Sequence, residues 1–156
     1  MNRYTVENLF SLAITQRTRS TQITMQVLNN QIHTTKVPSV VRNLKKHCPN
    51  VLVTQCFNEE NLPFIKEVKN TETGHLFEHI LLEYLCQLKI AKGHDEAIFE
   101  GRTSWNWVRD PRGKFYIRLT CGRKDADILP IAMEKTIALM KIVMQTNHQP
   151  IVSRHH

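Results

Sequence analysis

The chain has 156 residues, of which 41% are hydrophobic and 22% charged. This length suits one domain with its own core, and the composition excludes collagen-like repeats and low-complexity chains. Lysine and arginine outnumber aspartate and glutamate by 21 to 14, so the net charge of +7 favours acidic partners without identifying one. No apolar run is long enough to span a bilayer, and four scattered cysteines are too few for a disulfide scaffold. We therefore expect a soluble cytoplasmic protein that does not bind a membrane.

Hydrophobic periodicity predicts five strands and three helices, in the order ββαβαββα along the chain. The expected strands are 9–15, 21–28, 51–54, 97–103 and 114–121, and the expected helices are 38–46, 73–89 and 128–144. This order favours an α+β (or α/β) domain in which helices pack on one face of a mixed β-sheet. We expect one domain over residues 1–147, followed by a polar tail at 148–156.

The longest predicted helix carries the motif H-x-x-E-H, formed by His75, Glu78 and His79. Residues four apart on an α-helix differ by about 40° in direction and about 6 Å in height, so both imidazoles project from one face. This spacing suits a zinc ion, and Glu78 on the same face is placed to accept a proton from a metal-bound water. The motif predicts Zn²⁺ as cofactor and Glu78 as the general base.

A catalytic zinc ion normally has three protein ligands and one water, so a third ligand is needed. Cys56 is the first candidate, because it lies at the end of the predicted strand 51–54 and a thiolate binds zinc well. Cys121 and Glu83 are the alternatives, although Glu83 is also suited to orienting a ligating histidine.

The stretch from Cys56 to Leu119 resembles the N-terminal domain of cyanophycin synthetase, here as a stand-alone version. The resemblance lies in a cysteine, a phenylalanine, an Asn-Thr pair, an extended G-H-x-x-E-H helix, a G-R-T segment and a Pro-to-Gly turn before a strand. In this chain these are Cys56, Phe64, Asn70-Thr71, residues 74–84, Gly101-Arg102-Thr103, Pro111-Arg112-Gly113 and residues 115–119.

The resemblance implies a zinc metallopeptidase-like hydrolase that cleaves a peptide or isopeptide bond, in the Asp–Arg polymer cyanophycin or a related peptide. It implies that Cys56, His75 and His79 bind the metal, that Glu78 is the general base, and that Arg102 lines the substrate groove. The ATP-using domains of the synthetase are not within these residues, so we expect cleavage rather than synthesis.

Two other functions remain open at this point. The expected architecture is also similar to pitrilysin-type peptidases and to S-ribosylhomocysteinase, a metal lyase of nearly this length. The segment 104–116 interleaves aromatic and basic residues, as in modules that bind nucleic acids. We rank the lyase and the nucleic-acid-binding module below the hydrolase.

Overall fold

Five strands form one sheet in the order β1-β2-β3-β5-β4, and every pairing between neighbours is antiparallel. The strands are β1 (Asn2–Val6), β2 (Phe10–Gln16), β3 (Thr21–Val27), β4 (Gly101–Ser104) and β5 (Lys114–Leu119). The helices are α1 (Val40–His47), α2 (Thr73–Ala91) and α3 (Leu129–Met144). The computed structural model describes residues 1–54 and 62–144, so the predicted domain end at 147 and the tail 148–156 lie outside the described residues.

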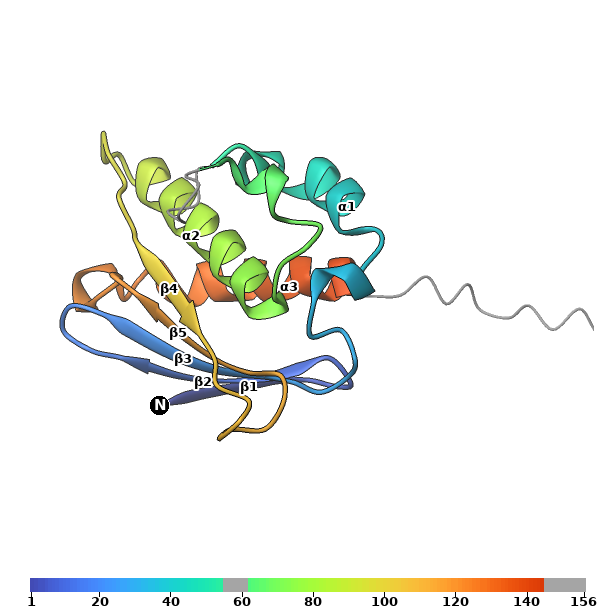
Figure 1. Cartoon of the computed structure of the whole chain (residues 1–156). Coiled ribbons are helices and arrows are strands. Elements are labelled where there is room, and N and C mark those ends of the chain that lie inside the picture. The colour runs from blue at the N-terminus through green and yellow to red at the C-terminus, as the bar shows by residue number, and fades with distance from the viewer. Residues whose placement is uncertain (55–61, 145–156) are drawn as a thin grey trace, which may run out of the picture.

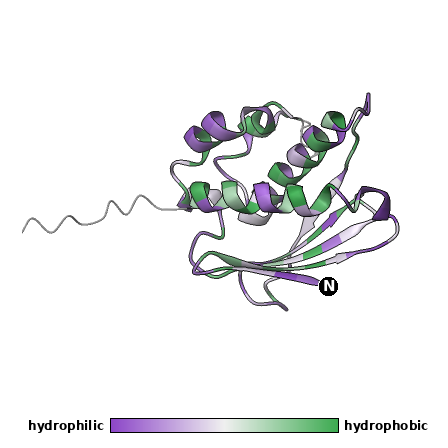
Figure 2. Ribbon diagram, turned by 180° about the vertical axis from the view of Figure 1, so that it is seen from behind, coloured by the Kyte–Doolittle hydropathy of each residue, from purple (hydrophilic) through white to green (hydrophobic). Residues whose placement is uncertain are grey.

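All three helices lie on the same side of the sheet, and its other face is uncovered by any described helix (Figure 1). Seen from behind, α3 is coloured mainly as hydrophobic where it lies over the sheet (Figure 2). The predicted α+β class with helices on one face is therefore confirmed. The sheet itself is antiparallel throughout rather than mixed, because hairpins and long helical connections bring each strand back in the opposite direction.

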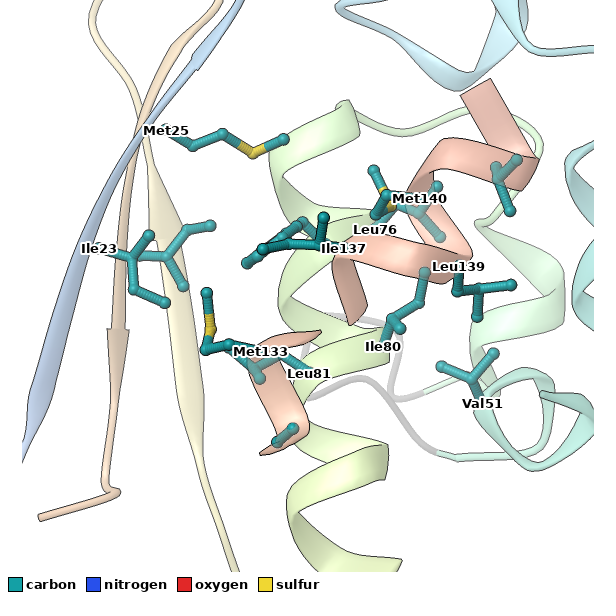
Figure 3. Packing of buried hydrophobic residues seen from close by; sticks show 14 of the residues in the cluster. Ile23, Met25, Val51, Leu76, Ile80, Leu81, Met133, Ile137, Leu139 and Met140 are labelled. Carbon is teal, nitrogen blue, oxygen red and sulfur yellow. The ribbon is translucent and has the colours of Figure 1, made fainter. Parts of the chain in front are cut away.

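The core lies between the sheet and the helices α2 and α3 (Figure 3). Alternate residues of the central strand β3, including Ile23 and Met25, are buried on the helical side. They face apolar residues of the two helices, among them Leu76, Ile80, Leu81, Met133, Ile137 and Met140. This packing fixes the N-terminal half of α2, which carries the H-x-x-E-H motif, over the sheet.

Gly74 allows a close approach of α2 to β5. A Cβ atom at this position would lie 2.4 Å from Cγ of the Phe115 ring, well inside van der Waals contact. Phe115 is fully buried, so its ring has no open space into which it can move. The absence of a side chain at Gly74 therefore sets the distance between the sheet and the residue that follows, His75.

The prediction of a strand at 51–54 is wrong. Residues Pro49–Leu52 form a 3₁₀ helix, in which Val51 and Leu52 are buried. Pro49 occupies the first turn, where its missing N–H costs nothing, and the Thr54 hydroxyl donates a 2.9 Å hydrogen bond to the carbonyl of Val51. Val51 and Leu52 are apolar because this segment packs into the core, and not because it forms a strand.

The structure also has one strand that the sequence did not predict and one that is shorter than predicted. Strand β1 was not expected, since Asn2, Arg3 and Thr5 are exposed and its sequence has no apolar run. The strand expected at 97–103 begins only at Gly101 and ends at Ser104. Short edge strands pack one side only, which weakens the hydrophobic pattern on which the prediction relies.

Candidate metal centre

Three predicted site residues come together on one face of α2. The Nε2 atoms of His75 and His79 lie 3.0 Å apart. One ligand atom from each of these histidines and one carboxylate oxygen of Glu78 all lie within 4.8 Å of one another. In the described part of the chain, this is the one group of three or more histidine, cysteine, aspartate or glutamate side chains with such a spacing.

The spacing of the two imidazole nitrogens suits a shared metal ion. Zinc–nitrogen bonds of about 2.0–2.1 Å in tetrahedral geometry place two nitrogen ligands about 3.3 Å apart. The observed 3.0 Å between the two Nε2 atoms is close to this value. The donor set of two imidazoles and a nearby carboxylate is also one that zinc accepts.

A threonine at the start of the helix orients the first ring. Thr71 Oγ1 lies 2.8 Å from Nδ1 of His75 and 3.4 Å from a carboxylate oxygen of Glu72. If Thr71 donates to Glu72, its oxygen accepts the Nδ1–H of His75, and the lone pair of His75 is then on Nε2. Hydrogen bonding at the far nitrogen is the usual way in which proteins hold a metal-binding histidine.

The Phe64 ring packs against the imidazoles of both His75 and His79. Its ring stacks on His79 at 3.8 Å between centroids and meets His75 edge-on at 5.4 Å. Burial in this apolar contact lowers the pKa of both histidines, and the neighbouring His75 helps to bring that of His79 to about 3. Both imidazoles are therefore neutral at pH 7, which is the form that binds a metal.

Glu78 is buried beside the histidines, and a residue of the sheet holds its carboxylate through a hydrogen bond. Thr103 of β4 donates a 2.7 Å hydrogen bond from Oγ1 to Oε1 of Glu78. Burial raises the pKa of Glu78 to about 7, and the Thr103 hydrogen bond partly opposes this rise. A carboxylate with a pKa near neutrality both accepts and returns a proton at physiological pH, as a general base must.

Gly101 makes room for this carboxylate. A Cβ atom at Gly101 would lie 3.0 Å from Cγ of Glu78 and 3.0 Å from a methyl carbon of Leu119. Both distances are tighter than ordinary packing, so a side chain here would press on Glu78. The cluster therefore depends on β4 as well as on α2.

Of the three candidates for the third metal ligand, the structure describes two. Cys56, the first candidate, lies outside the described residues and stays a prediction. Cys121 is buried and Glu83 accepts a 3.0 Å hydrogen bond from Gln87, and neither belongs to the cluster. The contact that orients His75 comes from Thr71 and not from Glu83.

The structure does not bring Arg102 to the cluster. Thr103 and Gly101 face α2, so the alternation of a strand turns Arg102 to the opposite, uncovered face of the sheet. There it is exposed and lies across from Arg118, the other arginine considered for substrate binding. From this position Arg102 does not take a direct part in chemistry at Glu78.

Sequence reasoning gave no role to Phe64, Thr71 and Thr103, although all three contact the cluster. Each belongs to the segments on which the resemblance to cyanophycin synthetase rests. Thr71 precedes His75 by four residues, a spacing that offers a hint of contact across one turn. No spacing in the sequence connects Thr103 with Glu78, because the two meet only when β4 pairs with β5.

The tryptophans of the loop between β4 and β5 serve its packing. Trp105 and Trp107 both contact the buried Phe115 ring edge-on, at 5.8 and 5.5 Å between centroids. The indole N–H of Trp107 donates a 3.0 Å hydrogen bond to the carbonyl of Lys114. These contacts give both tryptophans a packing role in the loop.

Within the described residues, no helix is long and apolar enough to cross a lipid bilayer. Comparison of the chain with curated proteins and with solved structures gives no match. The family model described as "Cyanophycin synthase-like N-terminal domain" matches residues 22–128, which is more than half of the chain and includes every predicted site residue. The chain therefore belongs to the cyanophycin synthase-like N-terminal domain family.

Proposed function

We propose that this protein is a zinc-dependent hydrolase that cleaves a peptide or isopeptide bond in the Asp–Arg polymer cyanophycin or in a related peptide. One observation carries the proposal: the Nε2 atoms of His75 and His79 face each other at 3.0 Å, with the Glu78 carboxylate beside them. Membership of the cyanophycin synthase-like family supports the choice of polymer.

His75 and His79 would hold the metal through Nε2, and Cys56 is the proposed third ligand. A divalent ion at this position supplies Lewis-acid activation of water and of a substrate carbonyl. The Thr71 hydroxyl at Nδ1 of His75 would favour the tautomer that binds the ion through Nε2, and Phe64 stacks on the His79 ring. These contacts hold the two rings in an orientation that suits a shared ion.

Glu78 would move the proton in both halves of the reaction. Its carboxylate accepts a proton from the attacking water and then donates that proton to the nitrogen of the leaving amine, so the carboxylate is regenerated. Thr103 holds Oε1 of Glu78 at 2.7 Å, which leaves the second carboxylate oxygen for the water. Burial raises the pKa of the Glu78 carboxyl group to about 7, so both its protonated and its ionised form are populated at neutral pH.

The proposal is tested by metal content and hydrolysis together. Protein purified without a chelating column is analysed for metals and then incubated with the Asp–Arg polymer, before and after treatment with a chelator. We expect bound zinc and release of shorter chains, with both lost in His79→Ala. The matched control is His47→Ala, since His47 is exposed at the end of α1, away from the cluster. A metal-free protein that still cuts the polymer would contradict the proposal.

A further inference from the structure

The strand that holds Glu78 lies at an edge of the sheet. Strand β4 pairs with β5 on one side, and it is last in the strand order. Over residues 1–54 and 62–144, no strand or isolated bridge pairs with its other side. An unpaired strand edge presents backbone N–H and C=O groups to any extended chain that approaches it.

The pairing with β5 determines which of these groups point outward. The amide of Thr120 donates a 2.9 Å hydrogen bond to the carbonyl of Glu100, its cross-strand partner. Bonded and non-bonded pairs alternate along antiparallel strands, so the next bonded pairs are Arg102 with Arg118 and Ser104 with Tyr116. The N–H and C=O groups of Gly101 and Thr103 therefore point away from β5, toward the free edge.

The same two residues contact the proposed general base. Thr103 donates its hydroxyl hydrogen to Glu78, and the bare Cα of Gly101 lies against the Glu78 side chain. The free backbone groups of β4 thus lie next to the carboxylate, and through it next to the two histidines. A chain paired with this edge would run past the proposed site of hydrolysis.

We propose that the substrate binds as an added strand on β4, through backbone hydrogen bonds to Gly101 and Thr103. This inference rests on the proposed function for the cleavage step, but not for the binding. Strand pairing needs a regular main chain of N–H and C=O groups, so it selects a main-chain peptide bond for cleavage rather than an isopeptide bond of a side branch.

Charges on the outer face of β4 suit a substrate with acidic and basic groups. Side chains of an added strand alternate between the α2 side and the uncovered side of the sheet. On the uncovered side the edge presents Arg102, and Glu100 lies two residues before it, and both are exposed. Arg102 is thereby a binding residue for a substrate carboxylate, because its planar guanidinium can donate hydrogen bonds to both carboxylate oxygens.

Amide hydrogen exchange measured by NMR tests the pairing directly. The probe is a soluble oligomer of the Asp–Arg polymer, added to the zinc-supplemented Glu78→Gln variant so that it is not cut. We expect the amide protons of Gly101 and Thr103 to exchange about tenfold more slowly with the oligomer bound. The amide protons of Arg102 and Ser104 already bond to β5 and should change much less. An oligomer that does not bind, or that protects neither Gly101 nor Thr103, overturns the proposal.

A second measurement uses the substrate backbone. Single N-methyl groups are placed at successive main-chain nitrogens of the oligomer, and binding to the same variant is measured. Strand pairing predicts that affinity falls at every second position, whereas a uniform effect along the chain contradicts it. Arg102→Gln should weaken oligomer binding about tenfold. Arg3→Gln, on the same face of the opposite edge strand β1, should leave binding unchanged.

The two proposals fail in different ways. Hydrolysis of the oligomer by the wild-type protein, without protection at Gly101 and Thr103, would overturn the added strand and keep the hydrolase. Protection at both residues without hydrolysis would keep the added strand and overturn the hydrolase.

Discussion

Thr103 on β4 donates a 2.7 Å hydrogen bond to the Glu78 carboxylate on α2, across 25 positions of the sequence. The bond joins the edge of the sheet to the helix that carries the H-x-x-E-H motif. It favours the ionised form of a carboxyl group whose burial favours the neutral form. The reactivity of Glu78 therefore depends on a residue outside the motif.

Removal of this hydroxyl should lower the fraction of Glu78 that is ionised at pH 7. In Thr103→Val the pKa of Glu78 rises further above its usual range, so less of the ionised form is present at pH 7. We expect hydrolysis to fall about tenfold at pH 7, in line with the loss of one hydrogen bond to a charged group. The acid limb of the pH profile should move to higher pH. Thr103→Ser keeps the hydroxyl and should keep the wild-type profile, and an equal shift in both variants would contradict this role.

Thr71 should matter for metal affinity more than for folding. Thr71→Val removes the hydroxyl that contacts Nδ1 of His75 at 2.8 Å, while the shape of the side chain is kept. Loss of such an outer hydrogen bond typically lowers metal affinity about 10- to 100-fold. Zinc affinity measured by competition with a chelator checks this, with Thr71→Ser as the control. Unchanged affinity in Thr71→Val would show that another group orients the ring.

The contact between Gly74 and Phe115 should appear as a coupling in stability. Gly74→Ala places a Cβ 2.4 Å from a carbon of the buried Phe115 ring. We expect a loss of about 1–3 kcal/mol in the free energy of unfolding. In a Phe115→Leu background the same change should cost less, because the smaller side chain gives way. Urea unfolding of the four proteins measures this coupling. If the stability losses of Gly74→Ala and Phe115→Leu simply add in the double variant, the Phe115 ring is not what excludes a side chain at position 74.

The metal-free protein should respond to pH through Glu78. The carboxyl group has a pKa of about 7 when folded and about 4.3 when unfolded, so the folded state binds more protons between these values. Its contribution to stability is therefore present at low pH and is lost as pH rises through this window. Glu78→Gln stays neutral and should be more stable than the wild type at pH 8, by up to about 3 kcal/mol. The difference should vanish near pH 4, and a difference that does not change with pH would rule out this ionisation.

The helix that carries the motif was predictable because its apolar residues repeat at helical spacing over many turns. Leu76, Ile80 and Leu81 are fully buried, as that pattern requires. The same spacing places His75 and His79 on one face, so a local rule was enough to bring the two rings together. Local rules were also enough for the strands expected at 9–15 and 21–28, which correspond to β2 and β3.

Other features depend on contacts between distant segments. Val51 and Leu52 lie in an apolar run that is buried as a 3₁₀ helix, and burial alone does not distinguish this from a strand. The contact of Thr103 with Glu78, and the turn of Arg102 to the opposite face, follow from the register of β4 against β5. A strand of four residues carries too little pattern for the sequence to fix that register.

Metal binding by His75 and His79 and proton transfer by Glu78 are separated in Glu78→Gln. The zinc content and the hydrolysis rate of this variant are measured on one preparation, with the Asp–Arg polymer as substrate. We expect the variant to keep about as much zinc as the wild type, since two imidazoles remain, while its rate falls about 10²- to 10⁴-fold. A variant that cuts the polymer as fast as the wild type would contradict proton transfer by Glu78, and a wild-type protein that binds no zinc would contradict metal binding by the two histidines.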